Sequence, residues 1–342
     1  MSKCKYTAIG GQALIEGIMM KSPEKTAMAV SMPDGTIDVS MLKYESLRKK
    51  YKILGIPVVR GVTSFIESMV QGYKAMMLSA EKSGFADLDE DDKKDTGEKS
   101  KFSKAVLSAV MVIGTVLGVA LAVVLFMYIP RLCVGGLEWL FKSDFSKFTR
   151  SGIEQLLKLT VFVLYMWGVS YMKDIKRVFM YHGAEHKTIF CYEKGLELTV
   201  ENVRKQSRFH PRCGTSFMIL MILISVIFST LVQMIFPQVY DIKWAWVVAK
   251  ILLIPIICGV GFEVLKICGK YDNIITRIIS APGLWMQRIS TKEPEDRMIE
   301  VAIAALRACE PEVPDVDRRV DRDSTAENTD RQEAEETEND NI

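Results

Sequence analysis

The chain has 342 residues, of which 49% are hydrophobic and 25% are charged, so it is too apolar for a disordered protein or an ordinary soluble domain. Its seven cysteines follow no short repeated spacing, which argues against a secreted disulfide scaffold. The net charge of +2 conceals a segregation, because residues 310–342 hold thirteen acidic side chains and only four arginines. We therefore expect a basic body followed by a disordered acidic tail.

Residues 1–83 predict a small cytoplasmic module of mixed α and β structure. Segments 26–32 and 36–41 alternate in polarity on either side of the turn Pro33-Asp34-Gly35, which indicates a β-hairpin. Segment 12–20 is expected to add a strand. The three glycines within residues 10–20 favour tight strand packing, because the strand-turn-helix context of a dinucleotide site is missing.

Residues 58–80 carry apolar side chains at helical spacing, with Arg60, Ser64, Glu67, Gln71 and Lys74 on the opposite face. This pattern predicts an amphipathic helix that lies along a membrane or against its spans. A helix that covers the hairpin is the alternative interpretation. An acidic linker, residues 84–103, then separates this module from the rest of the chain.

Four segments within residues 104–290 are predicted to cross a membrane: 105–129, 153–172, 213–240 and 244–266. The first and third contain no charged residue and exceed the roughly 20 residues that a spanning helix needs. The other two include Lys158, Lys250 and Glu263, so these charges must face other helices or reach the interface. The fold class is therefore an α-helical integral membrane protein.

Basic residues predict the orientation of these spans. Residues 173–212 hold nine Lys or Arg, against four in residues 129–152 and one in residues 237–243. Because basic loops stay in the cytoplasm, we expect loop 173–212 and both termini on the cytoplasmic side. These basic residues flank spans and form no nucleic-acid module. Residues 291–309 are expected to form a further amphipathic helix.

All three histidines lie in this cytoplasmic loop, as His182-Gly-Ala-Glu-His186 and His210-Pro-Arg-Cys213. On a helix, His182 and His186 share one face, so their imidazoles can bind one metal ion. The order H-x-x-E-H is that of inverted zincins, in which the glutamate, Glu185, activates a metal-bound water. Zn²⁺ or another divalent transition metal is the expected cofactor.

The sequence leaves the other ligands open. A catalytic zinc needs a third protein ligand and one open position, for which His210, Cys213, Glu193 and Glu263 are candidates. His210 and Cys213 together would close the site structurally with four ligands. In the simplest alternative, the histidines are packed core residues and bind no metal.

Two further carboxylates are candidate site residues. Glu263 follows twelve apolar residues inside a span and is a candidate ligand, proton carrier or partner of Lys266 or Lys270. It is also explained as a residue that reaches the interface from the inner end of the span. Glu16, between the N-terminal glycines, is the second candidate.

Three segments together resemble the YqhQ family, a group of multi-pass bacterial membrane proteins described as predicted metal-dependent enzymes: Gly10–Met20, Tyr181–Thr188 and Ser207–Ser216. The resemblance covers roughly residues 7–308. It implies a location in the bacterial cytoplasmic (inner) membrane. It also implies that His182, His186 and either His210 or Cys213 bind metal, with Glu185 as the base.

Two functional hypotheses follow, and both include contact with the lipid bilayer. The first is a metal-dependent hydrolase that acts at the cytoplasmic membrane surface on a peptide or another amphiphile. The second is a non-enzymatic partner of the membrane-protein insertion machinery or of nascent membrane proteins, with a structural metal or none. A transporter that uses Lys158, Lys250 and Glu263 ranks third, since the chain shows no internal repeat.

Overall fold

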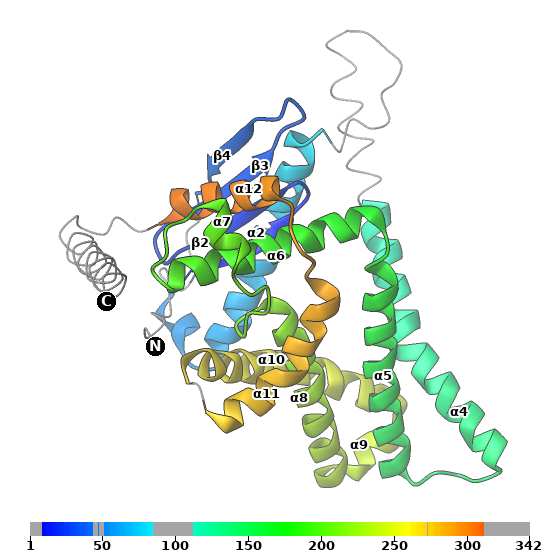
Figure 1. Cartoon of the computed structure of the whole chain (residues 1–342). Helices are drawn as coiled ribbons and strands as arrows, with labels where there is room; N and C mark the ends of the chain where they lie inside the picture. The colour runs from blue at the N-terminus through cyan, green and yellow to red at the C-terminus, as the bar shows by residue number, and fades with distance from the viewer. Residues whose placement is uncertain (1–8, 44–46, 48–50, 85–111, 272, 311–342) are drawn as a thin grey trace, which may run out of the picture.

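The computed structural model of the chain describes residues 9–43, 47, 51–84, 112–271 and 273–310 (Figure 1). The predicted linker and acidic tail lie almost entirely outside these residues. The strands are β1 (Gly10–Leu14), β2 (Gly17–Lys21), β3 (Thr26–Ser31) and β4 (Ile37–Met41). The helices after them are η1 (Lys52–Gly55), α2 (Val59–Lys82), η3 (Val124–Tyr128), α4 (Ile129–Phe141), α5 (Lys147–Val169), α6 (Lys173–Glu193), α7 (Val200–Arg204), α8 (Gly214–Ile235), α9 (Pro237–Asp241), α10 (Lys243–Lys270), α11 (Ile274–Ser290) and α12 (Asp296–Cys309).

The four strands form one antiparallel sheet in the order β1-β2-β3-β4. The predicted hairpin is β3 and β4, with Ala29 opposite Val39. Residues 12–20, expected to form one strand, instead belong to the two strands β1 and β2. A two-residue turn at Ile15 and Glu16 reverses the chain between Leu14 and Gly17, which are paired.

The sheet is packed on both faces. Ile18, Met20, Ala27 and Ala29 lie in one core with α6 and α12, whereas Leu14, Met19, Met28 and Val30 lie in another with Ala75 of α2. This alternation follows from the two-residue period of a strand, which sends neighbouring side chains to opposite faces. The predicted helix at 291–309 is α12, and it covers the sheet rather than standing apart.

Four helices are long and apolar enough to cross a membrane: Val112–Phe141, Phe148–Val169, Gly214–Ile235 and Trp244–Lys270. They correspond to the four predicted spans and indicate membrane association. The first differs from the prediction, because its helix does not end near Ile129 but continues through Pro130 to Phe141. Pro130 lies in the first turn of α4, next to the π-helical segment η3, where the ordinary hydrogen-bond pattern is already interrupted.

Helix α2 forms where its periodicity predicts it, and its polar face is the one that is buried against the protein. Ser64, Glu67 and Gln71 are buried, whereas Met69 is 61% and Tyr73 is 56% exposed. Most other residues of the buried face are small, which lets the helix pack closely against the sheet and α10. The apolar face is therefore left outside.

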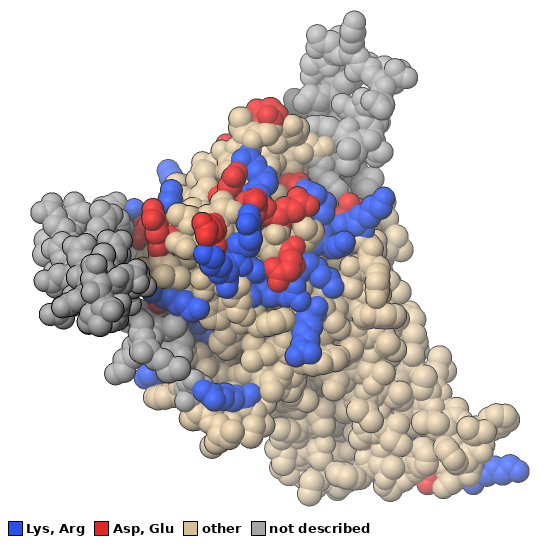
Figure 2. All heavy atoms as spheres, viewed as in Figure 1, with Lys and Arg blue, Asp and Glu red and all other residues tan. Residues whose placement is uncertain are grey.

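Charged side chains are distributed unevenly over the surface. Figure 2 shows Lys, Arg, Asp and Glu gathered over the sheet, α6, α7 and α12, while the face formed by the long helices carries few of them, at the adjoining ends of α10 and α11 on the left and at its far tip. The rest of that face consists of residues other than Lys, Arg, Asp and Glu, drawn in tan. This division between a charged end and an apolar end agrees with a protein that is partly immersed in lipid.

Candidate metal centre

Helix α6 places two imidazole side chains next to each other. His182 and His186 are four residues apart, so they occupy successive turns of one face, and their ring centroids lie 4.4 Å apart. His186 is 2% exposed and His182 is half-buried. The four-residue spacing therefore places both imidazoles on one face of α6, as the sequence predicted.

Cys213 supplies a thiol from the other side. It is the N-cap residue of α8, with an extended backbone (φ −76°, ψ 147°), and its Sγ accepts a hydrogen bond from the Thr215 N–H at 3.4 Å. His182 Nε2 lies 3.1 Å from this sulfur. One nitrogen from each histidine and the sulfur all lie within 4.8 Å of one another, so the three residues form a candidate metal-binding group.

Backbone carbonyls orient both imidazoles. His182 Nδ1 lies 2.9 Å from the Ser290 carbonyl oxygen at the end of α11, and His186 Nδ1 lies 2.6 Å from that of Arg208. A proton on each Nδ1 donates to these carbonyls, which leaves Nε2 as the metal-facing atom. Metal-binding histidines commonly have this second hydrogen bond, because it fixes the tautomer and the ring.

The electrostatics of the group favour a deprotonated sulfur. Burial alone would raise the pKa of the Cys213 thiol, but His182 and His186 lower it well below its usual range. Burial lowers the pKa of His182, and the Cys213 thiolate overcomes this effect and raises that pKa to about 9. These opposite pKa shifts favour a thiolate–imidazolium pair in the metal-free group, and a metal cation would displace the His182 proton.

Glu185 lies beside this group in an unusual environment. It is 5% exposed, it accepts the backbone N–H of Gly11 in β1, and its Oε2 has no hydrogen-bond partner within the described residues. Burial raises the pKa of this carboxyl, against the opposing effect of His182 and His186. A Cβ on Gly11 would lie 2.8 Å from Glu185 Cδ, so the glycine-rich N-terminal segment leaves room for this carboxylate.

His210 is turned away from the three donors. Its Nδ1 accepts the Arg212 N–H at 3.3 Å, and its Nε2 faces Glu193 Oε2 at 3.8 Å. Glu193 also pairs with Arg212. The structure therefore brings His182, His186 and Cys213 together and places His210 and Glu193 in a neighbouring polar cluster.

Gln287 of α11, which the sequence reading missed, holds the loop before Cys213. Its side chain is fully buried, accepts the His210 N–H at 2.7 Å and donates to the His210 carbonyl at 2.7 Å and to Ser216 Oγ at 2.9 Å. Sequence alone does not say which loop such a residue binds.

Close packing explains why position 183, between the two histidines, is a glycine. A Cβ at this position would lie 2.0 Å from the Lys292 carbonyl oxygen, and the Lys292 N–H donates to the Phe179 carbonyl at 2.8 Å. The segment after α11 therefore runs directly over α6. This contact brings the Ser290 carbonyl to His182.

The geometry fits a transition metal. In a tetrahedral site the nitrogen and sulfur ligand atoms stand about 3.3–3.8 Å apart, so the 3.1 Å between His182 Nε2 and Cys213 Sγ would lengthen slightly to meet the requirement. Imidazole and thiolate together suit Zn²⁺ and exclude the hard cations Mg²⁺ and Ca²⁺ as preferred ions.

The two remaining candidate carboxylates lie in ion pairs. Glu16 binds Arg177 of α6, with 2.6 Å between Oε2 and Nη2, and accepts the Tyr181 hydroxyl at 3.1 Å. Glu263 binds Arg60 of α2, with 2.6 Å between Oε1 and Nε. The sequence had suggested Lys266 or Lys270 as its partner.

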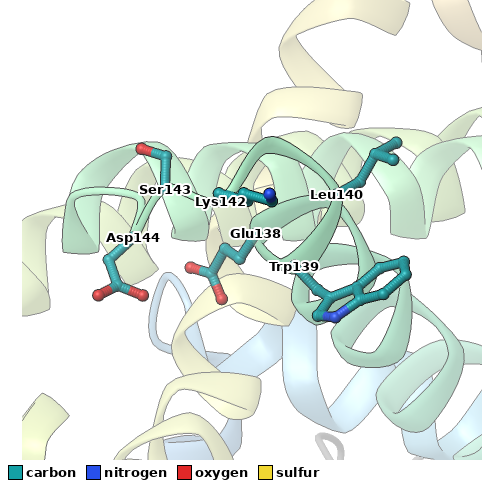
Figure 3. Close-up of a pocket in the computed structure, with 6 residues that line it drawn as sticks. All are labelled: Glu138, Trp139, Leu140, Lys142, Ser143 and Asp144. Atoms are coloured by element: carbon teal, nitrogen blue, oxygen red, sulfur yellow. The ribbon is translucent and has the colours of Figure 1, made fainter.

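The hollows that stand out among the described residues lie elsewhere. One is at the turn from α4 to α5, where the side chains of Glu138, Trp139 and Asp144 splay in different directions (Figure 3). A smaller one lies between α8, α10 and α11, next to Gly283. Neither is lined by His182, His186 or Cys213.

The fold and the site define a helical membrane-associated protein with a small antiparallel sheet and a candidate His₂Cys metal centre. The family model described as "Protein of unknown function (DUF1385)" matches residues 56–312, and the chain belongs to that family. It is also similar to "Uncharacterized protein YqhQ" of Bacillus subtilis (strain 168). The two are 38% identical over 306 residues, which cover 89% of this chain and 92% of the relative. No solved structure matches the chain.

Proposed function

We propose that this protein is a metal-dependent hydrolase of the bacterial cytoplasmic membrane, with Zn²⁺ or a similar ion bound by His182, His186 and Cys213. The observation that carries the proposal is the pairing of this three-donor group with Glu185. Three protein donors leave one coordination position for water, and Glu185 offers a buried oxygen that has no partner among the described residues.

The chemistry would divide between metal and protein. The metal would polarise the scissile bond and lower the pKa of water. Glu185 would accept the proton of the attacking water and return it to the leaving group, and its raised pKa suits such a proton carrier. Gly11 positions this carboxylate through its backbone N–H.

The proposed location follows from charge and hydropathy. The metal-binding group lies on α6 and at the start of α8, next to the charged part of the surface in Figure 2. The excess of Lys and Arg in residues 173–212 supports a cytoplasmic position for this part and for both termini. A substrate that is itself partly immersed in lipid, such as an amphiphilic peptide, suits a site at the membrane surface.

One observation favours a second candidate, a non-enzymatic factor that assists membrane-protein insertion or binds nascent membrane proteins. His186 and Cys213 are 2% and 5% exposed, as in a structural metal site. A metal there would tie α6 to α8 and serve stability alone.

Cobalt substitution separates the two candidates. Purified protein is loaded with Co²⁺ and titrated with azide, which binds an open coordination position and changes the visible spectrum. The hydrolase proposal predicts a change in wild type and in Glu185→Gln, together with loss of function of Glu185→Gln in cells that depend on this protein. A spectrum that azide leaves unchanged would contradict it and favour the structural metal, and so would full function of Glu185→Gln.

A further inference from the structure

The turn before α2 is an apolar tip. Residues 53–59 read Ile-Leu-Gly-Ile-Pro-Val-Val, seven residues without a polar side chain. Ile53 is 71%, Ile56 is 52% and Val59 is 38% exposed. Soluble surfaces seldom leave such a continuous run in water, so its surroundings need an explanation.

This tip packs against the middle of a candidate span. A Cβ on Gly259 of α10 would lie 2.6 Å from the Val58 carbonyl oxygen, and one on Gly61 would lie 2.9 Å from the Gly259 Cα. Close backbone contact between small residues is typical of helix packing in membranes. Gly259 stands eleven residues before the end of the span at Lys270, which is about 16 Å along the helix.

An ion pair lies one helical turn from this contact, nearer the end of the span. Arg60 is the charged residue in the first turn of α2, and it makes two hydrogen bonds to Glu263 of α10. The backbone N–H of Val58 donates to the same carboxylate. In water Arg60 would need no partner, whereas in hydrocarbon a charge must be paired. Glu263 of the span is therefore the acid that pairs with Arg60 next to the tip.

The face of α2 that points away from the protein continues the tip. Ile66, Met69, Val70 and Tyr73 follow the i, i+3, i+4, i+7 pattern and are 48–61% exposed. The polar and small side chains of α2 are used for contacts with the sheet and α10. This arrangement makes sense if the surroundings of the outer face are apolar.

We infer that residues 53–70 are inserted into the bilayer from the cytoplasmic side, beside α10. Lipid acyl chains then cover Ile53, Ile56 and Val59 at the tip and Ile66, Met69 and Val70 along the first half of α2. The chain enters and leaves on the same side, so this element adds no span. The inference is independent of the metal centre.

Photo-crosslinking tests whether lipid covers this surface. In the full-length protein, the photoreactive amino acid benzoylphenylalanine replaces Ile56. This protein is reconstituted into vesicles of phosphatidylethanolamine and phosphatidylglycerol. The matched control has the same amino acid at Met41, which is 53% exposed on β4, at the opposite end of the molecule from the long helices in Figure 1. After illumination, mass spectrometry separates lipid adducts, protein adducts and unmodified chain.

Insertion predicts a several-fold higher yield of acyl-chain adducts at Ile56 than at Met41. Crosslinks from Ile56 to a second copy of the chain would overturn the inference and make this face a protein interface. A lipid yield equal to that of Met41 would also overturn it, since the tip would then lie in water.

A substitution gives an independent readout. Ile56→Asp is expected to lower the unfolding temperature of the protein in these vesicles, because a charge is costly in hydrocarbon, whereas Met41→Asp is expected to leave it unchanged. Equal, small effects of the two substitutions would contradict insertion.

Discussion

At the scale of single residues, the candidate metal centre depends on groups that orient its donors. Two backbone carbonyls aim the imidazoles, and Gln287 fixes the loop that delivers Cys213. These contacts join α6, α8 and α11, which are distant in sequence. The candidate metal-binding group is thus a product of tertiary packing more than of any single motif.

We expect Gln287→Ala to weaken this loop. The substitution leaves the buried His210 N–H and carbonyl without partners, at a cost of about 1–3 kcal/mol for each group that water does not reach. The free energy of unfolding and the affinity for Zn²⁺ should both fall, and chemical denaturation with a zinc titration measures them. Gln238→Ala, at an exposed position, is the control. Unchanged metal affinity in Gln287→Ala would show that the loop is held by other contacts.

Glu16 gives a prediction with a defined pH dependence. Burial would raise the pKa of this carboxyl, but hydrogen bonds from Arg177 and Tyr181 hold it below the ordinary value of 4.5. A carboxyl with a lowered pKa stabilises the folded state above its ordinary pKa and loses this effect as the pH falls through its folded value. Glu16→Gln should therefore cost about 1 kcal/mol at pH 7.

The cost of Glu16→Gln should shrink as the pH falls below the ordinary pKa of 4.5 and through the lower pKa of the folded carboxyl, where the wild-type side chain becomes protonated as well. Unfolding measured at neutral and acidic pH tests this, with the exposed Glu24→Gln as control. A cost that stays constant over this range would exclude the ion pair as its origin.

The sequence predicted part of this arrangement. Helical spacing placed His182 and His186 on one face, because that spacing has a fixed geometry. It could not choose between His210 and Cys213, since residues 205–213 form a loop without a period. In this loop, the Arg212 N–H and Glu193 contact the His210 ring and turn it away from the candidate metal centre. Cys213 lies at the centre because it is the N-cap residue of α8.

At the scale of elements, hydropathy predicted the four long helices and the hairpin, but it left open whether the apolar face of α2 meets a membrane or the sheet. Ile66, Met69 and Tyr73 of that apolar face are exposed. Close packing against α10 instead depends on Gly61 and Gly259. A pattern of hydrophobicity does not reveal contacts that depend on small size, nor whether the surroundings are water or lipid.

Gly259→Ala tests this crossing. The added Cβ would lie 2.4 Å from Val58 Cγ1 and 2.6 Å from its carbonyl oxygen, so α2 must move away from α10. We expect a loss of about 1–3 kcal/mol in the free energy of unfolding, as for other overpacked contacts. Thermal unfolding in detergent measures it.

The matched control is Gly118→Ala in the first long helix, where a Cβ meets no described atom within 4 Å. Alanine there should be neutral or slightly stabilising. Gly114, one turn earlier, likewise faces open space within the described residues. If both alanine variants behaved alike, the crossing of α2 and α10 would not be a tight contact.

At the scale of the whole molecule, the chain folds back on itself. Strands near the N-terminus and α12 near the C-terminus share one core with α6, between the second and third long helices. Composition predicted an N-terminal module but not this sharing, because hydropathy carries no information about which distant segments pair. The arrangement requires the sheet, α6 and α12 to lie on the same side of a membrane.

The orientation is open to direct measurement. Ser143 in the turn between α4 and α5 and Glu197 after α6 are both exposed. In the proposed topology, Ser143→Cys reacts with a membrane-impermeant maleimide in intact cells, while Glu197→Cys reacts after the cells are opened. The unsubstituted chain gives the background from its own cysteines. The reverse pattern of labelling would place the candidate metal centre outside the cell.

Metal content of the purified protein tests the central claim most directly. Elemental analysis of protein prepared without chelators should find about one zinc or other transition-metal ion per chain. His182→Ala, His186→Ala and Cys213→Ala should each lose it, whereas Cys133→Ala, at an exposed position in α4, should keep it. Folded wild-type protein that holds no metal even after zinc is resupplied would contradict the account.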